Sequence, residues 1–315
     1  MEKISVENPR VLITGATGFI GRALCASMEG EGWEVHALLR RVPGDKDALP
    51  LKMENLHILE SGQGNINKLL ECSKPDVVFH LASLFLASHT PDDTDDLVLS
   101  NILFGTKLVE AMTLLGINNF VNTGTAWQHY EGRKYCPVNL YAATKQAFED
   151  ILEFYVNSRG LKVVTLKLND TYGPGDKRKK LLPVLVEKFL KGESIQLARG
   201  ENMLDLVYID DVCSAFIAAG KRLMHKKVRA HERFAVSSGR PVDLRHLVSV
   251  FSEVVGIDVH PQWGAFPQRG REIINPCGGG KGIPGWKPKV SLKEGIEMIL
   301  RNSKIVNDRK GNFKK

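Results

Sequence analysis

Three residues in the first half of the chain, Thr125, Tyr141 and Lys145, have side chains suited to proton transfer. Tyr141 and Lys145 are four positions apart, so on a helix both side chains lie on one face. A tyrosine hydroxyl has a pKa of about 10, and an ammonium group one turn away favours its phenolate. Lysine can also hold ribose hydroxyls, and a threonine hydroxyl can polarise a carbonyl. Together these groups suit protonation of a ketone oxygen while hydride reaches its carbon.

Tyr-x-x-x-Lys spacing is common on amphipathic helices, so it does not by itself indicate a reaction. A glycine-rich turn near the start of the chain provides a second, independent signal. Residues 11–13 are an apolar run typical of a buried strand, and residues 19–28 are apolar at helical spacing. Between them, Gly15 permits a tight turn, Gly18 lets backbone approach a pyrophosphate, and Gly21 allows close helix packing. The helix N-terminus favours phosphate. This order predicts a dinucleotide site; a glycine-rich turn without a ligand is the simpler alternative.

The end of the second predicted strand, residues 33–41, bears on which dinucleotide binds. A carboxylate there would accept hydrogen bonds from a ribose 2′-hydroxyl and repel a 2′-phosphate. This sequence has Arg40 and Arg41 instead, and guanidinium groups suit a phosphate. We therefore expect NADP(H) rather than NAD, with a solvated basic strand end as the alternative interpretation.

Strand and helix patterns alternate up to residue 176, which predicts an α/β fold: a Rossmann-type doubly wound parallel sheet. The rhythm then changes, which predicts a smaller mixed α/β C-terminal substrate domain. We expect an NADP-binding domain over residues 1–175, mainly substrate domain over 176–301 with some segments returning to the first, and a polar tail over 302–315. Further predicted strands cover residues 55–60, 75–82, 117–125, 163–168, 194–198, 204–209 and 234–237. Predicted helices cover residues 68–72, 101–115, 141–155, 181–190, 244–255 and 292–301, with another beginning at 210; residues 88–96 and 169–176 are predicted as a polar loop and a turn.

The bulk composition is that of a soluble globular protein, with 43% hydrophobic and 25% charged residues among 315. The net charge of +7 is concentrated in short local runs without a nucleic-acid-binding motif, so we expect no nucleic acid partner. The five scattered cysteines, with no Cys-x-x-Cys pair, predict reduced thiols in a cytoplasmic chain, and no metal site. No apolar run approaches the roughly 18 residues that cross a bilayer, so we expect no membrane insertion.

The chain resembles the extended short-chain dehydrogenases/reductases, the nucleotide-sugar epimerase/dehydratase/reductase family. The resemblance spans residues 9–300. Within this family the chain is most similar to 4-ketoreductases of the CDP-abequose synthase type. It is carried by the glycine turn, His80-Leu81-Ala82, Asn101 with Gly105-Thr106, Thr125, Tyr141-x-x-x-Lys145, residues 172–175, 210–212, 268–273 and 285–288.

This resemblance implies a role for each matching residue. Thr125, Tyr141 and Lys145 would be the catalytic residues, and a homodimer would form through the active-site helices. Cofactor-binding residues would be Gly15, Thr17, Gly18, Phe19, Ile20, Arg40, Arg41, Asn65, Ile66, Leu81, Ala82, Thr123, Tyr141 and Lys145. Substrate-binding residues would be Ser83, Thr125, Ala126, Trp127, Asn169, Asp170, Arg269 and Glu272, with Arg269 gripping the diphosphate of a nucleotide sugar.

Departures from the family pattern narrow the expected reaction. Dehydratases carry an Asp-Glu pair after the catalytic threonine, where this chain has Ala126 and Trp127, so we reject that reaction. Asp170 replaces a substrate-binding asparagine of the family. Leu204 replaces an arginine, so we expect the diphosphate contact of that arginine to be lost or to move to the basic cluster at residues 177–180. We expect an NADPH-dependent 4-ketoreductase acting on a nucleotide-linked 4-keto-6-deoxy hexose or heptose, in deoxysugar and surface-polysaccharide synthesis. The alternatives are an epimerase that retains NAD and a non-catalytic nucleotide-sensing scaffold.

Overall fold

The central element is a seven-stranded parallel sheet with the order β3-β2-β1-β4-β5-β6-β10. The computed structural model describes residues 8–41, 49–59, 66–178, 180–265, 271, 273, 276 and 280–302. Short buried runs of branched and aromatic residues form these strands, as expected for a sheet covered on both faces. The strands are β1 (Arg10–Thr14), β2 (Glu34–Leu39), β3 (Leu56–Ile58), β4 (Val77–His80), β5 (Asn119–Thr125), β6 (Lys162–Leu168) and β10 (His231–Val236).

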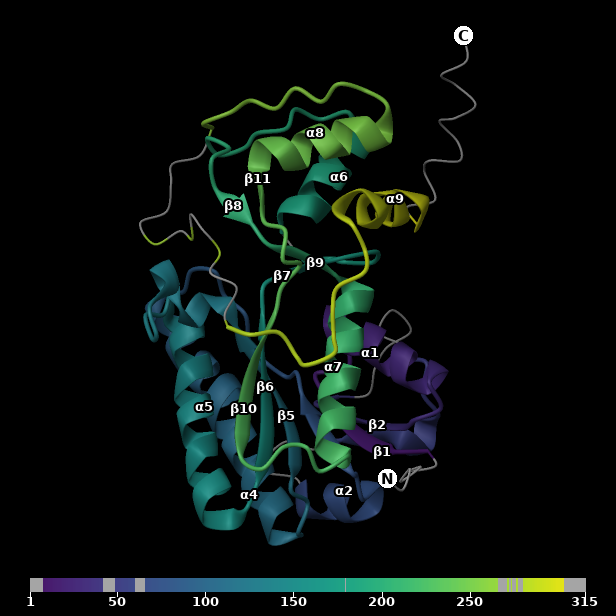
Figure 1. Cartoon of the computed structure of the whole chain (residues 1–315), viewed down its shortest axis with the longest axis vertical. Helices are drawn as coiled ribbons and strands as arrows, with labels where there is room; N and C mark the ends of the chain where they lie inside the picture. Colours follow the sequence, from purple (N-terminus) through teal and green to yellow (C-terminus); the bar gives the residue numbers. More distant parts are fainter. Residues whose placement is uncertain are drawn as a thin grey trace.

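Helices cover both faces of this sheet, and a separate hydrophobic cluster lies between the sheet and the helices on each face (Figure 1). One face carries α1 (Phe19–Gly30) and α7 (Ile209–Met224), which pack against each other. The other carries α2 (Ile66–Ser73), α4 (Phe104–Leu114) and α5 (Leu140–Arg159). The predicted Rossmann-type α/β fold is therefore confirmed, and the carboxyl ends of β1, β4, β5 and β6 meet at one edge.

A smaller group of elements lies beyond this edge, at the top of Figure 1. It contains α6 (Leu181–Lys191), α8 (Leu244–Val255) and α9 (Leu292–Asn302). Two small sheets accompany them: parallel β7 (Asp170–Tyr172) and β9 (Leu206–Tyr208), and antiparallel β8 (Met203–Leu204) and β11 (Val242–Asp243). The chain enters this group after β6, returns to the main sheet through α7 and β10, and then leaves it again.

Three predicted elements in the second half are wrong in detail. Residues 194–198 form only an isolated bridge between Gln196 and Gln262, because a turn follows at once at Trp263. The strand predicted over 204–209 is broken at Asp205, whose buried carboxylate accepts hydrogen bonds from the Ser238 backbone N–H and the Ser237 hydroxyl. The turn predicted over 169–176 contains β7, because that segment pairs with β9.

The region before α4 also differs from the prediction. The predicted polar loop contains a 3₁₀ turn, Pro91–Asp93, and α3, Thr94–Val98, with Thr90 and Asp93 forming a capping box. Val98, an apolar residue three positions before the predicted helix over residues 101–115, is 41% exposed. A π-helical turn, Leu99–Leu103, separates Val98 from α4, and its wider winding changes which residues face the core.

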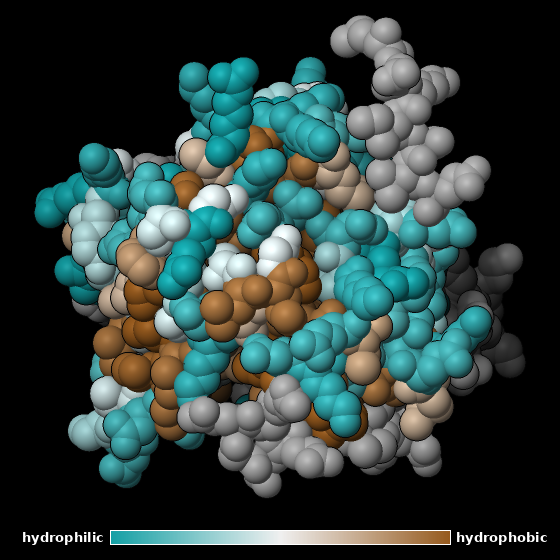
Figure 2. Space-filling model, turned by 90° about the horizontal axis from the view of Figure 1, so that it is seen from below, coloured by the Kyte–Doolittle hydropathy of each residue, from teal (hydrophilic) through white to brown (hydrophobic). Residues whose placement is uncertain are grey.

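The continuous helical segment Pro91–Leu114 is long and apolar enough to cross a membrane, by length and composition. A helix that packs into a protein core can have the same composition, and Leu97, Leu108, Val109 and Met112 are fully buried here. The segment ends at the lower face of the molecule, where hydrophobic side chains gather among polar ones (Figure 2). Leu114, the last residue of the segment, is a large exposed hydrophobic residue.

Candidate active site

Close backbone packing shapes the dinucleotide turn between β1 and α1. Gly15 has φ of +72°, and a Cβ added there would lie 2.6 Å from the Ala82 backbone nitrogen. A Cβ on Gly21 would lie 2.2 Å from the Gly15 carbonyl oxygen. Glycine at both positions therefore allows the turn, α1 and the end of β4 to lie together, with Gly18 as the N-cap of α1.

A cavity of about 510 Å³ extends from this turn along the end of β2. It is lined on one side by the turn and on the other by the segment after β4 and the π-helical turn. Arg40 lines the cavity with an exposed side chain, at the position where a dinucleotide fold places the adenosine ribose. The lining includes Gly15, Thr17, Gly18, Leu38, Leu39, Arg40, Leu81, Ala82 and Ser83.

The three residues with the predicted proton-transfer chemistry meet in an adjoining cavity of about 220 Å³. Tyr141 and Lys145 lie in the first turns of α5, which begins where Asn139 caps the helix by accepting a 2.9 Å hydrogen bond from the Ala142 N–H. Thr125 ends β5 and lines the same cavity. Gly15 and Gly18 line both cavities, so the glycine turn and the reactive side chains share one continuous groove.

Burial changes the proton affinities of the pair. Burial raises the pKa of Tyr141 to about 12, although a Ser83 hydrogen bond and the Arg178 charge act in the opposite direction. Burial lowers the pKa of Lys145 to about 8, although the Glu149 carboxylate acts to raise it. At neutral pH the tyrosine is therefore protonated and the lysine largely charged, the states needed to donate a proton to a carbonyl oxygen.

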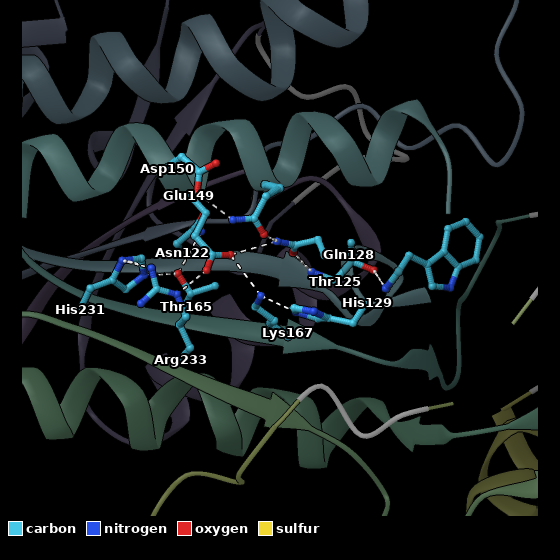
Figure 3. Close-up of polar contacts among 12 residues, drawn as sticks. Asn122, Thr125, Gln128, His129, Glu149, Asp150, Thr165, Lys167, His231 and Arg233 are labelled. Atoms are coloured by element: carbon cyan, nitrogen blue, oxygen red, sulfur yellow. Dashed lines mark hydrogen bonds and ion pairs between the residues drawn. The ribbon is translucent and has the colours of Figure 1, made fainter. Parts of the chain in front are cut away.

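The hydroxyl of Thr125 is oriented by the short 3₁₀ turn η5, Ala126–Gln128. Its Oγ1 accepts a hydrogen bond from the Trp127 N–H at 3.2 Å, which leaves the hydroxyl proton available to donate. Its own N–H donates to the Gln128 side-chain oxygen at 2.9 Å. Figure 3 shows Gln128 between Thr125 and the polar side chains of α5.

A third cavity, of about 480 Å³, continues from the reactive groups toward the smaller group of elements. Trp127, Asn169 and Asp170 line both this cavity and the one holding Tyr141. Its outer wall includes Asn202, Asp205 and Arg271, whose guanidinium packs over Tyr130 and donates to the Pro137 carbonyl. A second molecule could thus reach Tyr141 from the side opposite the dinucleotide turn.

Comparison with known proteins identifies the family of this chain. The sequence model of the NAD dependent epimerase/dehydratase family matches residues 11–231. The chain belongs to this family. CDP-abequose synthase of Salmonella typhimurium is 26% identical over 301 residues, covering 92% of this chain and 97% of that protein. UDP-glucose 4-epimerase of Mycolicibacterium smegmatis is 28% identical over 313 residues, covering 91% and 96%.

Solved structures of the family have the same architecture. UDP-glucose 4-epimerase of Thermotoga maritima, in a structure with UDP-glucose, aligns with a TM-score of 0.76 at 25% identity, covering 96% of this chain and 99% of that one. The Thermus thermophilus enzyme, in complex with NAD, aligns at 0.74 and 25% identity, covering 93% and 98%. The fold of this chain is therefore that of enzymes of the epimerase/dehydratase family.

The structure brings together most of the predicted site residues. Gly15, Thr17, Gly18, Phe19, Ile20, Arg40, Leu81, Ala82, Ser83, Thr123, Thr125, Trp127, Tyr141, Lys145, Asn169 and Asp170 line one or more of the three cavities. Ala126 is buried beneath the turn, and neither it, Arg41 nor Ile66 belongs to these linings. Asn65, Arg269 and Glu272 lie outside the described residues.

The reactive cavity is also lined by Phe85, which was not among the predicted site residues, and by Arg178, which belongs to the 177–180 cluster expected to contact a diphosphate. Gln128 is buried and lines none of the three cavities. Phe85 lines the reactive cavity, with its ring centroid 5.0 Å from that of Tyr141. Arg178 also lines it, with its guanidinium 4.4 Å from the Phe19 ring centroid and paired with Asp176. The sequence carried a signal for Gln128, because Thr-x-x-Gln is the pattern of a capping box, and for Arg178, because it belongs to the basic 177–180 cluster.

Unsatisfied polar atoms show that the groove fits a nicotinamide dinucleotide. Lys145 Nζ and Thr123 Oγ1 are buried and have no hydrogen-bond partner among the residues that the structure describes. Both residues line the reactive cavity, so ribose or amide groups of a bound cofactor would satisfy them there. The glycine turn would hold the pyrophosphate, and Lys145 the nicotinamide ribose.

Proposed function

We propose that this enzyme reduces the 4-keto group of a nucleotide-diphosphate-linked 4-keto-6-deoxy sugar, with exchangeable NADPH as the reductant. When bound, NADPH supplies the hydride. The observation that carries the proposal is Arg40, which lines the adenosine end of the groove where a carboxylate would select NAD. A guanidinium there favours the 2′-phosphate, and a cofactor that must be exchanged each turnover suits a reductase.

The residues of the chain provide the proton and orient the ketone. Tyr141, protonated at neutral pH, donates its proton to the carbonyl oxygen. Thr125, whose Oγ1 already accepts a hydrogen bond from the Trp127 N–H, donates a hydrogen bond to the same oxygen and keeps its proton. Lys145 holds its charge next to the developing oxyanion and favours the tyrosinate left after transfer. The cavity beyond Trp127 would receive the sugar diphosphate and its base.

Nearby polar groups connect Tyr141 to a buried network. Ser83 contacts the tyrosine hydroxyl and donates to Asn101 Oδ1 at 3.0 Å. Asn101 is 1% exposed, and its amide also donates to Thr144 Oγ1. We propose that Ser83 and Asn101 hold Tyr141 in place and help to restore its proton after each turnover.

The second candidate function is an epimerase that retains NAD and returns the hydride to the same sugar. It is favoured by the likeness to the T. maritima and T. thermophilus UDP-glucose 4-epimerases. The two reactions use the same three reactive side chains and differ in cofactor exchange. Release of NAD from purified, denatured protein in a 1:1 ratio, retained through gel filtration, would favour the epimerase and contradict the reductase.

The decisive assay supplies the substrate class directly. Purified enzyme is mixed with NADPH and a panel of CDP-, GDP-, dTDP- and UDP-linked 4-keto-6-deoxy sugars, and absorbance at the nicotinamide band is followed. We expect oxidation with at least one of them and none with Tyr141→Phe. Oxidation with none of the panel by folded wild-type enzyme would overturn the proposed reductase function.

We also propose a cytoplasmic homodimer that associates through α4 and α5, which lie side by side. Phe154 on α5 is 57% exposed, more than such a large apolar side chain usually is in a monomer. Sedimentation equilibrium should give twice the chain mass, and Phe154→Glu should give a monomer. A wild-type monomer at micromolar concentration would contradict the proposed assembly.

A further inference from the structure

Gln128 occupies a junction between the strand and the helix that carry the reactive groups. It is fully buried, and its side-chain oxygen accepts the Thr125 N–H at 2.9 Å. Its amide nitrogen donates to Gln146 at 2.6 Å and to the Glu149 carboxylate at 3.0 Å, both on α5. One side chain thus links the end of β5 to the helix that begins with Tyr141 and Lys145 (Figure 3).

The helix side of this link is fixed by buried charges. Glu149 is 1% exposed and is paired with Arg233 at 2.5 Å and with Lys167 at 3.5 Å. Lys167 in turn contacts His129 Nε2 at 2.6 Å, directly after η5. A buried carboxylate with two cationic partners resists displacement, since breaking a pair leaves its charge uncompensated. Gln128 is therefore anchored to a carboxylate that has little freedom to move.

The strand side has room for this amide because of Gly124. A Cβ at that position would lie 2.9 Å from Gln128 Oε1 and 3.1 Å from a Thr165 methyl carbon. The glycine next to Thr125 thus allows Gln128 to reach back to the Thr125 backbone. Without this bond, Thr125 would lose one of the two hydrogen bonds that determine the direction of its hydroxyl.

We infer that Gln128 is a positioning residue: anchored by Glu149, it fixes Thr125 relative to Tyr141 so that both can donate to one carbonyl oxygen. A misplacement of about 1 Å can lower a rate by about 100-fold, so the link is expected to act on turnover. Gln128 lines none of the three cavities, so its loss is expected to leave the binding of cofactor and nucleotide sugar unchanged. The inference rests on the proposed function only for the choice of assay.

Gln128→Met tests this inference, because methionine keeps the length of the side chain and removes both polar ends. We expect kcat to fall about 10- to 100-fold, with KM for the keto sugar and the Kd for NADPH, read from tryptophan fluorescence, within twofold of wild type. In a double-mutant cycle, Gln128→Met should cause little further loss once Thr125→Ala is present. Equal losses in both backgrounds, or an unchanged kcat, would overturn the inference.

Asn122→Leu is the matched control. Asn122 is also a fully buried amide on β5, and it donates to Thr165 Oγ1 at 3.1 Å without contacting Thr125. It should lower the unfolding temperature as Gln128→Met does, yet leave kcat within twofold of wild type. A comparable loss of kcat would show that the loss of any buried amide near the end of β5 slows the enzyme, and would contradict a specific role for Gln128.

A second variant covers the case in which Gln128→Met does not fold. Gln128→Glu with Glu149→Gln exchanges the two groups, keeps an acceptor for the Thr125 N–H and keeps one carboxylate in the cluster. We expect kcat within about tenfold of wild type, well above Gln128→Glu alone, where two carboxylates face each other at 3.0 Å. A double variant no faster than that single variant would overturn the inference.

The assay separates this inference from the proposed function. If wild-type enzyme oxidises no NADPH with any keto sugar, the reductase proposal fails, and the same variants are measured by epimerisation of UDP-glucose. Thr125 and Tyr141 have the same part in that reaction. Loss of kcat on Gln128→Met in either assay supports the positioning role, and its absence overturns it.

Discussion

Catalysis should fall with rising pH at the pKa of Lys145, and this limb should move when Glu149 loses its charge. Burial lowers the Lys145 pKa to about 8, and the Glu149 carboxylate, one turn along α5, opposes that effect. Glu149→Gln keeps the shape and the hydrogen bond from Gln128 while removing the charge. The lysine should then release its proton at a lower pH.

The size of both effects can be worked out. With a pKa of about 8, the charged fraction of Lys145 falls about tenfold between pH 7 and pH 9. Side chains four apart on a helix are about 6 Å apart, and at an effective dielectric constant of about 20 one charge then contributes about 3 kcal/mol, or two pKa units, as an upper bound. Because Lys167 loses the same carboxylate and can shed its own proton, we expect a net shift of about one unit.

The assay is kcat/KM for NADPH between pH 6 and pH 10, which reports the ionisations of the free enzyme. Wild type should show a limb near pH 8, and Glu149→Gln a limb near pH 7. Glu153→Gln is the control, because Glu153 also binds Arg233 but lies two turns from Lys145. A limb near pH 8 in all three proteins would refute the assignment to Lys145 and Glu149.

Three other expectations test separate parts of the structure. Arg40→Asp should weaken NADPH binding about tenfold or more relative to NADH, because a charge-assisted contact contributes about 1.5–3 kcal/mol and this side chain is exposed; equal losses of both cofactors in fluorescence titrations would count against it. Tyr141→Phe should lower kcat at least about 100-fold while leaving the NADPH Kd within about threefold, as single-turnover kinetics would show. Burial lowers the pKa of His80 from 6.5 to about 3. Between these two pH values the imidazole is neutral in the native state and protonated in the unfolded chain. The free energy of unfolding is therefore highest above pH 6.5 and falls as the pH is lowered, by about 2 kcal/mol at pH 5. In urea unfolding, His80→Leu should lack this decrease of about 2 kcal/mol between pH 6.5 and pH 5.

The sequence predicted the parts of the site that depend on local patterns. Gly15, Gly18 and Gly21 have fixed spacing around one turn, and Tyr141 and Lys145 lie one turn apart on one helix, so each pattern could be read within a short window. Their meeting also follows from sequence, because parallel strands place their carboxyl ends at one edge.

What could not be predicted depends on contacts between distant segments. Arg178 lines the groove because its loop folds back over Phe19, 159 positions earlier. The break at Asp205 depends on hydroxyls at residues 237 and 238. Val98 is exposed because a π-helical turn follows it, and the apolar pattern of that helix gives no sign of the extra residue.

The return of the chain through α7 and β10 has a consequence for engineering. Helix α7 packs on α1, β5 and β6, and β10 is the edge strand that carries Arg233 to Glu149. A chimera made by a single crossover after residue 176 would therefore replace α7 and β10, which pack against strands and helices that precede the crossover, together with the smaller group of elements. Three crossovers, after residue 176, before α7 and after β10, would exchange the elements around the third cavity and leave α7 and β10 in their native frame.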